Sequence, residues 1–236
     1  MEEGKAKQMI INTLKEKCAI KQQVYDNTID TFNLLKEVLQ ELVKEYNKNL
    51  KKVDTRVWLE YSDKGAFEAE LKVAGDLLVF NMHTNIFDFY RDHGIWKTSY
   101  VRENDFSTYT GIISIFNFLT DSFKYNRLDD LGYLIGRIFI NKDNHYFVEG
   151  KRQLGFLYNK FGNDKISKDN ISRIVESAIL YALDFDLLVP PYDAVKITSV
   201  AQMKERINKS KMKTGKRLGF RFYADDDELT DDKEML

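Results

Sequence analysis

The residues best suited to chemistry lie near the C-terminal end of the chain, where the charges are sorted by sign. From Lys204 to Arg221 there are eight basic residues and one acid. Lysine and arginine neutralise backbone phosphates, and an aromatic ring such as that of Phe220 can stack on an exposed base. We therefore predict that this basic arm contacts nucleic acid or another polyanion, with a protein partner as the alternative. The predicted contacts are Lys204, Arg206, Lys209, Lys211, Lys213, Lys216, Arg217, Phe220 and Arg221.

A run of acids follows the basic arm. From Asp225 to Glu234 there are seven acidic residues and one lysine. Blocks of like charge do not pack against themselves and usually serve as interaction segments. We predict that this acidic tail, residues 225–236, is disordered and competes with an anionic ligand for the arm, because a short connection keeps the two close. A solubilising end without contacts would have the same composition.

A second candidate for chemistry is Glu149-Gly150-Lys151, which directly follows the apolar residues 146–148. A carboxylate there can hold Mg²⁺ and a lysine can position water. The pattern resembles half of the motif of the PD-(D/E)xK family of metal-dependent nucleases, which implies catalytic roles for Glu149 and Lys151. Gly136-Arg137 stands where that family carries Pro-Asp. Asp130 is the candidate substitute acid, since the other candidate, Asp143, lies in a predicted turn. A polar hairpin turn accounts for the same residues, so the nuclease is kept as the alternative function.

Metal and cofactor motifs are otherwise missing from the sequence. The three histidines, at positions 83, 93 and 145, include no pair with the i, i+4 spacing of a helical metal site. The single cysteine, Cys18, has no second cysteine to join it in a disulfide or metal site. The glycines are spread over the chain rather than gathered in a phosphate-binding loop. We therefore predict no metal, no cofactor and no catalytic site.

The composition predicts a folded protein of the cytoplasm. Hydrophobic residues make up 43% of the 236, which is enough for a core. Sixteen phenylalanines and thirteen tyrosines favour a protein that contains a sheet. No apolar run approaches the roughly 18 residues of a membrane span. One cysteine suits a reducing compartment.

Helical periodicity marks both ends of the folded part. Residues 5–51 are predicted to form one short and one long helix, with a break near Asp26-Asn27. Apolar residues between Ile29 and Leu50 recur at spacings of three and four. This stripe is too broad to be covered by one sheet, so a homodimer through the helices is expected. A second helix is predicted at 168–186, with Ser167 or Asp169 as its cap.

Between the two helical regions, apolar residues recur at every second position instead of every third or fourth. Strands are predicted at 57–61, 67–73 and 77–82 and again at 133–140, 145–148 and 154–158, each set forming an antiparallel meander. In the middle region, 86–91 is predicted as a short helix and 96–101 as a strand. Residues 112–119 are ambiguous, with strand favoured by their isoleucines and phenylalanines.

We therefore predict an α+β fold, an antiparallel sheet of five to seven strands flanked by a long N-terminal helix and a C-terminal helix. The expected parts are a helical segment 1–52, a sheet domain 53–189, the arm 190–224 and the tail 225–236. The paired prolines Pro190-Pro191 end the sheet domain, because neither a helix nor a central strand continues through them. The order of elements resembles that of GAF and PAS sensor domains.

Three functions are compatible with these patterns. The favoured one is a non-enzymatic intracellular regulatory or adaptor protein that self-associates through its helices and contacts an anionic partner through the arm. The alternatives are the metal-dependent nuclease centred on Glu149 and Lys151 and a GAF- or PAS-like sensor of a small ligand.

Overall fold

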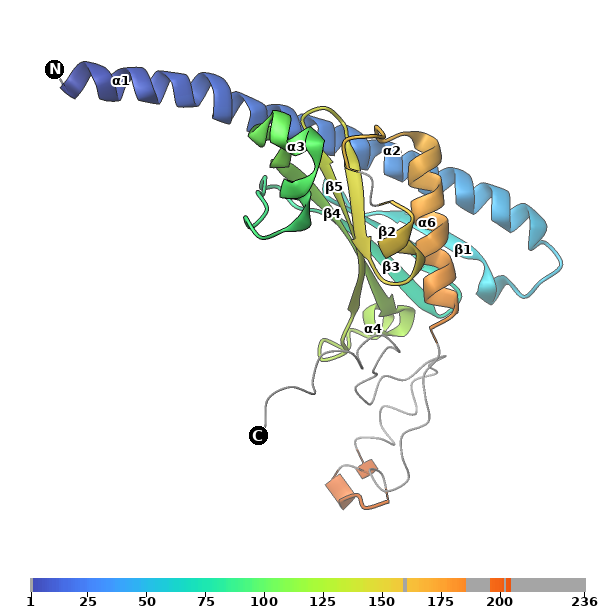
Figure 1. Ribbon diagram of the computed structural model, residues 1–236. Coiled ribbons are helices and arrows are strands. Elements are labelled where there is room, and N and C mark those ends of the chain that lie inside the picture. Colours follow the sequence, from blue (N-terminus) through green and yellow to red (C-terminus); the bar gives the residue numbers. More distant parts are fainter. Residues whose placement is uncertain (1, 159–160, 186–195, 202, 205–236) are drawn as a thin grey trace, which may run out of the picture.

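The fold is that of a computed structural model, which describes residues 2–158, 161–185, 196–201 and 203–204. It combines one antiparallel sheet with helices, which confirms the predicted α+β class (Figure 1). Among the described residues, no helix is both long and apolar enough to cross a membrane.

A single long helix runs through the N-terminal segment. It consists of α1 (Glu2–Thr13), one π-helical turn, η1 (Leu14–Cys18), and α2 (Ala19–Asn49). The break predicted near Asp26-Asn27 is wrong. The Asn27 amide instead donates to the carbonyl oxygens of Asn141 and Lys142, at 3.0 and 2.9 Å. A polar side chain that interrupts the apolar pattern is therefore explained by a tertiary hydrogen bond, not by a helix end.

Six strands form one sheet in their order along the chain. They are β1 (Leu59–Asp63), β2 (Glu68–Val73), β3 (Asp76–Met82), β4 (Thr110–Leu119), β5 (Tyr133–Asn141) and β6 (Tyr146–Gly150). All neighbouring pairs are antiparallel. The predicted strands of the first meander, the strand at 133–140 and the ambiguous strand at 112–119 are confirmed. Along β4, buried residues alternate with half-buried ones, as expected of a strand with one face on the core. A short 3-10 turn, η2 (Thr55–Val57), leads into β1.

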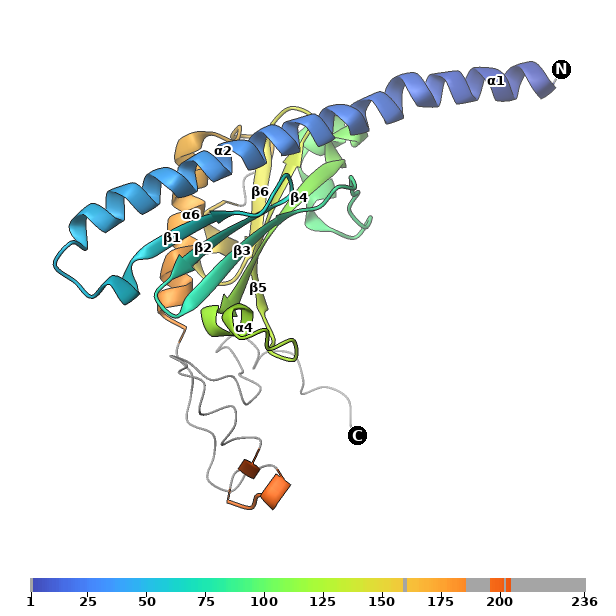
Figure 2. The ribbon, with the colours of Figure 1, turned by 180° about the vertical axis from the view of Figure 1, so that it is seen from behind.

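Helix α6 (Lys168–Leu183) lies beside α2 on one face of the sheet, which confirms the predicted C-terminal helix (Figures 1 and 2). Ser167 caps α6 by accepting from the backbone N–H of Asn170. Fully buried side chains from α2, α6 and the inner face of the sheet form one core. The apolar stripe of α2 is part of this core, with Phe32 and Leu35 at 0% exposure. A single chain therefore covers the stripe, and the predicted homodimer would need another surface.

Helix α2 approaches the sheet closely at β4. A Cβ atom on Gly111 would lie 2.0 Å from Oγ1 of Thr28, so only glycine fits at this crossing. Thr28 is buried and satisfies its hydroxyl by donating to the carbonyl of Val24 at 2.6 Å. Small residues on both elements thus set the distance between helix and sheet.

Two predicted strands are wrong. Residues 96–101 form the 3-10 turn η3 (Gly94–Lys97) and the start of α3 (Ser99–Glu103), which continue into η4 (Asp105–Thr108). Residues 154–158 begin in the short helix α5 (Gln153–Phe156). Leu154, fully buried, sits over the cross-strand glycines Gly136 and Gly150, whose missing side chains leave room for it. Its burial therefore reflects a local gap in the sheet and not strand alternation. Helix α4 (Thr120–Lys124) follows β4.

The predicted helix at 86–91 is also wrong. That segment has irregular backbone apart from one β-bridge between Phe87 and Thr110. The segment from His83 to Thr98 connects β3 to β4 and contributes aromatic side chains to a second, smaller apolar cluster on the outer face of β5 and β6. This cluster contains Phe89, Ile95, Trp96, Tyr100, Val101, Ile112, Phe139, Phe147 and Phe161.

Candidate ligand-binding pocket

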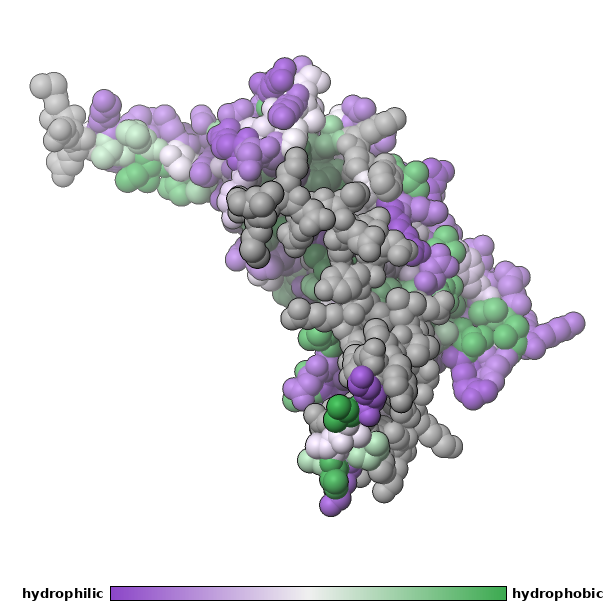
Figure 3. Space-filling model, turned by 60° about the horizontal axis from the view of Figure 1, so that its bottom comes forward, coloured by the Kyte–Doolittle hydropathy of each residue, from purple (hydrophilic) through white to green (hydrophobic). Residues whose placement is uncertain are grey.

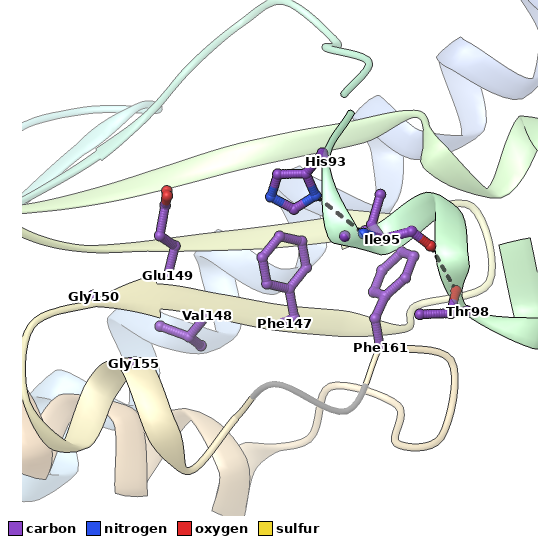
Figure 4. Close-up of a pocket in the computed structure, with 10 residues that line it drawn as sticks. His93, Ile95, Thr98, Phe147, Val148, Glu149, Gly150, Gly155 and Phe161 are labelled. Atoms are coloured by element: carbon purple, nitrogen blue, oxygen red, sulfur yellow. Dashed lines mark hydrogen bonds between the residues drawn. The ribbon is translucent and has the colours of Figure 1, made fainter. Parts of the chain in front are cut away.

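A pocket of about 420 Å³ opens beside the edge strand β6, under the turn η3 (Figure 4). Its volume falls within the usual range of small-molecule sites. Its walls come from three separate parts of the chain: the β3–β4 connection, β6 with the glycines near it, and Phe161. The lining residues are His93, Gly94, Ile95, Thr98, Phe147, Val148, Glu149, Gly150, Gly155 and Phe161.

Aromatic rings form the apolar wall of the pocket. Phe147 stacks on Phe139, its cross-strand neighbour on β5, with centroids 4.6 Å apart and planes at 5°. Phe161 meets Phe147 edge to face, at 5.6 Å and 78°. Each such contact adds roughly 0.5–1.5 kcal/mol to the burial of the rings. The wall is therefore rigid, and it presents ring faces and edges to the cavity.

His93 lies over Phe147 and supplies a hydrogen-bond donor (Figure 4). Its Nδ1 accepts from the backbone N–H of Ile95 at 3.2 Å and so caps η3. The neutral imidazole therefore carries its proton on Nε2. The ring also stacks on Phe89, with centroids 4.7 Å apart. Hydrogen bond and stacking together hold the ring in one orientation.

Glu149 provides an acceptor on the same face of β6 as Phe147. Its Oε2 accepts from Nε of Arg137 at 2.8 Å and from Nη2 of the same guanidinium, which leaves Oε1 as an acceptor. Arg137 is the register partner of Glu149 on β5 and also lies over the Phe139 ring at 5.4 Å. Both side chains of this ion pair are exposed, so it adds little to stability. Its effect is to fix the position of the carboxylate.

The nuclease-like residues have different partners in the structure. Arg137, which stands where the family carries an acid, is the partner of Glu149. Asp130 belongs to another network, where it accepts from the Ser122 hydroxyl at 2.6 Å and pairs with Arg127 at 2.7 Å. The backbone N–H of Lys151 donates to the carbonyl of Ile135. Within the described ranges, no three His, Cys, Asp or Glu side chains are placed to hold a metal ion.

The predicted nucleic-acid contacts are not placed. Of the nine, only Lys204 falls within the described ranges, where it is exposed. The other eight lie outside the described residues, as do the acidic tail and the paired prolines, so the arm stays a sequence-based prediction.

A polar network lies near the far end of β6 from Glu149, around the β5–β6 turn. The Tyr100 hydroxyl donates to Oδ2 of Asp143 at 2.5 Å and accepts from the amide of Asn141 at 2.9 Å. Burial, followed by the hydrogen bond to Asp143, raises the pKa of Tyr100 to about 12. Burial alone would raise the pKa of Asp143, but hydrogen bonds from Lys142 and Tyr100 outweigh it and lower that pKa. The network ties α3 to the turn and holds the β3–β4 connection in place.

We expect this network to make part of the stability depend on pH. Because the folded-state pKa of Asp143 is depressed, its contribution is present above the ordinary aspartate pKa, about 3.9, and is lost as pH falls through the lower folded value. Asp143→Asn should lower the unfolding free energy by about 1 kcal/mol or less at pH 7, since the group is partly exposed. Urea titrations of wild type and Asp143→Asn at pH 7 and pH 3 measure this difference in unfolding free energy.

The difference between wild type and Asp143→Asn should shrink at pH 3. Tyr100→Phe removes one of the two hydrogen bonds that lower the pKa, and it should flatten the same pH dependence. A difference that stayed constant from pH 7 to pH 3 would show that Asp143 does not titrate as the geometry implies.

Comparison with protein-family models, with curated proteins and with solved structures found no match for this chain. The function is therefore inferred from the pocket itself. Of its key residues, the sequence singled out Glu149, as part of the nuclease-like pattern, and considered His93 only as a metal ligand. Phe147 and Phe161 were not singled out. The available signal was the number of aromatic residues, which indicates a sheet and not a site.

Proposed function

We propose that the protein is a non-enzymatic regulatory protein that binds a small planar heteroaromatic molecule in the pocket beside β6. The proposal rests on one observation: a single cavity of ligand size is lined by aromatic side chains, one hydrogen-bond donor and one hydrogen-bond acceptor. Phe147 and Phe161 provide the apolar surface, Nε2 of His93 the donor and Oε1 of Glu149 the acceptor.

The chemistry of the walls suggests the ligand class. A flat ring can lie against the aromatic walls and gain stacking energy, about 1–3 kcal/mol for a base on a protein aromatic. A ring edge that carries both a donor and an acceptor would match His93 and Glu149. Nucleobases and similar heterocycles have such edges. The order of elements resembles that of GAF and PAS domains, and this resemblance predicted the same role, a sensor of a small ligand.

A second candidate function is kept for the basic arm. Contact with nucleic acid or another polyanion, or with a protein partner, is favoured by the separation of eight basic residues from seven acids in the sequence. The two functions are compatible, since an intracellular regulator needs both an input and an output.

The pocket is tested by fluorescence titration. Trp96 donates from Nε1 to the carbonyl of Phe89 and belongs to the aromatic cluster next to the cavity, so a bound ring should change its emission. Trp58→Phe leaves Trp96 as the only tryptophan, because the chain has two. We expect saturable titration with at least one of the probes adenosine, guanosine and cytidine. Glu149→Gln should weaken the binding about tenfold, since a charge-assisted hydrogen bond contributes roughly 1.5–3 kcal/mol.

A matched control comes from the other edge of the sheet. Glu60 on β1 pairs with Lys72 as Glu149 pairs with Arg137, and it is similarly exposed. Glu60→Gln removes the same kind of ion pair away from the pocket and should leave the affinity unchanged. The absence of saturable binding by all three nucleosides at 1 mM, or an equal loss in both glutamine variants, would refute the proposal.

A further inference from the structure

The first part of the long helix projects beyond the body of the protein, as both opposite views show (Figures 1 and 2). Residues 12–19 are all exposed, and the first fully buried side chain along the helix is Val24. At 1.5 Å per residue, the projection from residue 2 to residue 22 is roughly 30 Å long. It carries large exposed apolar side chains: Met9, Ile10 and Leu14 are 63%, 60% and 58% exposed.

Apolar side chains gather along one side of this projection (Figure 3). Ala6, Ile10, Leu14 and Cys18 follow one another at intervals of four, which places them in one row on the helix surface. In a regular α-helix such a row drifts by about 40° per step, because 3.6 residues complete a turn. The π-helical turn η1 spans Leu14–Cys18 and is wider than an α turn. It therefore turns Cys18 back towards the line of Ile10 and straightens the row.

We propose that this row is the contact between two copies of the chain, whose α1 helices pair antiparallel. In this arrangement Ile10 of each copy lies level with Leu14 of the other, so that the two largest side chains of the row meet twice. Ala6 lies level with Cys18, a small residue opposite a small residue. The i, i+4 ridges of both helices can then interdigitate, which is the commonest mode of helix packing.

The length of the projection fits this alignment. With residue 12 at the centre, Glu2 lies level with Gln22 of the second copy, two residues before the first buried residue, Val24. The two projections therefore overlap along their length, and the two bodies sit at opposite ends. Each N-terminus then lies beside the stretch of the other helix where Lys17 and Lys21 reach the Tyr109 ring of its body.

The charges also favour the antiparallel direction. In the antiparallel alignment, Lys7 and Lys17 are the only lysines of residues 4–22 that come level with each other. A parallel pair would instead place five lysines beside their own copies: Lys5, Lys7, Lys15, Lys17 and Lys21. Like charges aligned in this way destabilise a helix pair.

Light scattering on the full chain at tens of micromolar tests the contact. Wild type should have the mass of a dimer. Ile10→Asp combined with Leu14→Asp should give a monomer, with at least a 100-fold weaker association, because four charges would enter the apolar seam. The thermal unfolding of the body should stay unchanged, since both residues lie outside its core. Asn12→Asp adds an acid between them on the opposite side of the helix and should leave the dimer intact.

The single cysteine tests the direction. In the antiparallel pair the two Cys18 residues are about 18 Å apart along the axis, too far for a disulfide. Under a mild oxidant, wild type should stay non-covalent, while Ala6→Cys should produce a covalent dimer that joins position 6 to Cys18 of the second copy. A monomeric wild type would overturn the proposal. Covalent dimers of wild type, or none with Ala6→Cys, would overturn the antiparallel alignment.

Discussion

Phe32→Asp is expected to abolish cooperative folding. The Phe32 side chain is 0% exposed and lies in the core between α2, α6 and the inner face of the sheet. Loss of a buried phenylalanine costs about 3–5 kcal/mol, and an uncompensated buried carboxylate adds to that cost. The sum approaches or exceeds the roughly 5–15 kcal/mol by which a domain of this kind is stable. Near-ultraviolet circular dichroism and urea titration of the purified variant measure the loss.

Two further variants make the result specific to burial. Phe32→Leu keeps the site apolar and should cost about 1–2 kcal/mol, with a cooperative transition retained. Asn33→Asp adds the same charge at the adjacent, exposed position and should change the unfolding free energy by less than about 0.5 kcal/mol. If Phe32→Asp unfolded cooperatively with nearly wild-type stability, α2 would not pack on the sheet as described.

Changing Lys211, Lys213, Lys216 and Arg217 together to alanine is expected to lower the affinity for single-stranded nucleic acid about 100-fold or more at low salt. Each phosphate contact on a single strand contributes about −0.7 to the slope of log affinity against log salt. The loss of four contacts should therefore reduce the magnitude of that slope by about three. The loss should be the same for different nucleotide sequences, because lysine–phosphate contacts carry no base information. Fluorescence anisotropy with labelled oligonucleotides at several salt concentrations measures both quantities.

Truncation after Tyr223 should have the opposite effect. If the seven acids compete with the ligand for the arm as predicted, their removal should tighten binding and steepen the salt slope. Phe220→Ala should weaken single-strand binding more than double-strand binding, since only unpaired bases are free to stack. If the truncated protein bound neither DNA, RNA nor heparin in a salt-dependent way, the arm would be a structural or protein-binding element.

Prediction from the sequence worked best where local geometry forces a period. A helix that packs on a sheet must repeat its apolar residues every three to four positions, and α2 and α6 were predicted for that reason. A strand with one buried face must alternate, as the residues of β2 do. The exact residues of β6 were less well predicted, because Glu149 and Gly150 resemble a turn but continue the pairing with Arg137 and Gly136.

The errors fall where burial comes from distant residues. Residues 96–101 were predicted as a strand, yet half-buried Trp96 and buried Val101 pack in the aromatic cluster on β5 and β6, and their backbone forms helical turns. Leu154 is buried by the gap over two glycines. Asn27 interrupts an apolar stripe and indicated a helix break, but its amide binds carbonyl groups of the β5–β6 turn. For Asn27, Trp96 and Val101 the partners are far away in sequence, and for Leu154 one of the two glycines, Gly136, lies on a different strand.

The sequence by itself determined the class of the fold, the positions of the two packing helices and most of the strands. These follow from periodicity, which each segment must satisfy alone in order to bury one face. Only the tertiary structure decided the candidate site. His93 lies in the β3–β4 connection, Phe147 and Glu149 lie on the edge strand β6, and Phe161 comes after α5. No local sequence pattern relates these residues, because they come from separate segments of the chain. They lie close together only because the β3–β4 connection and the segment after α5 both pack against β6.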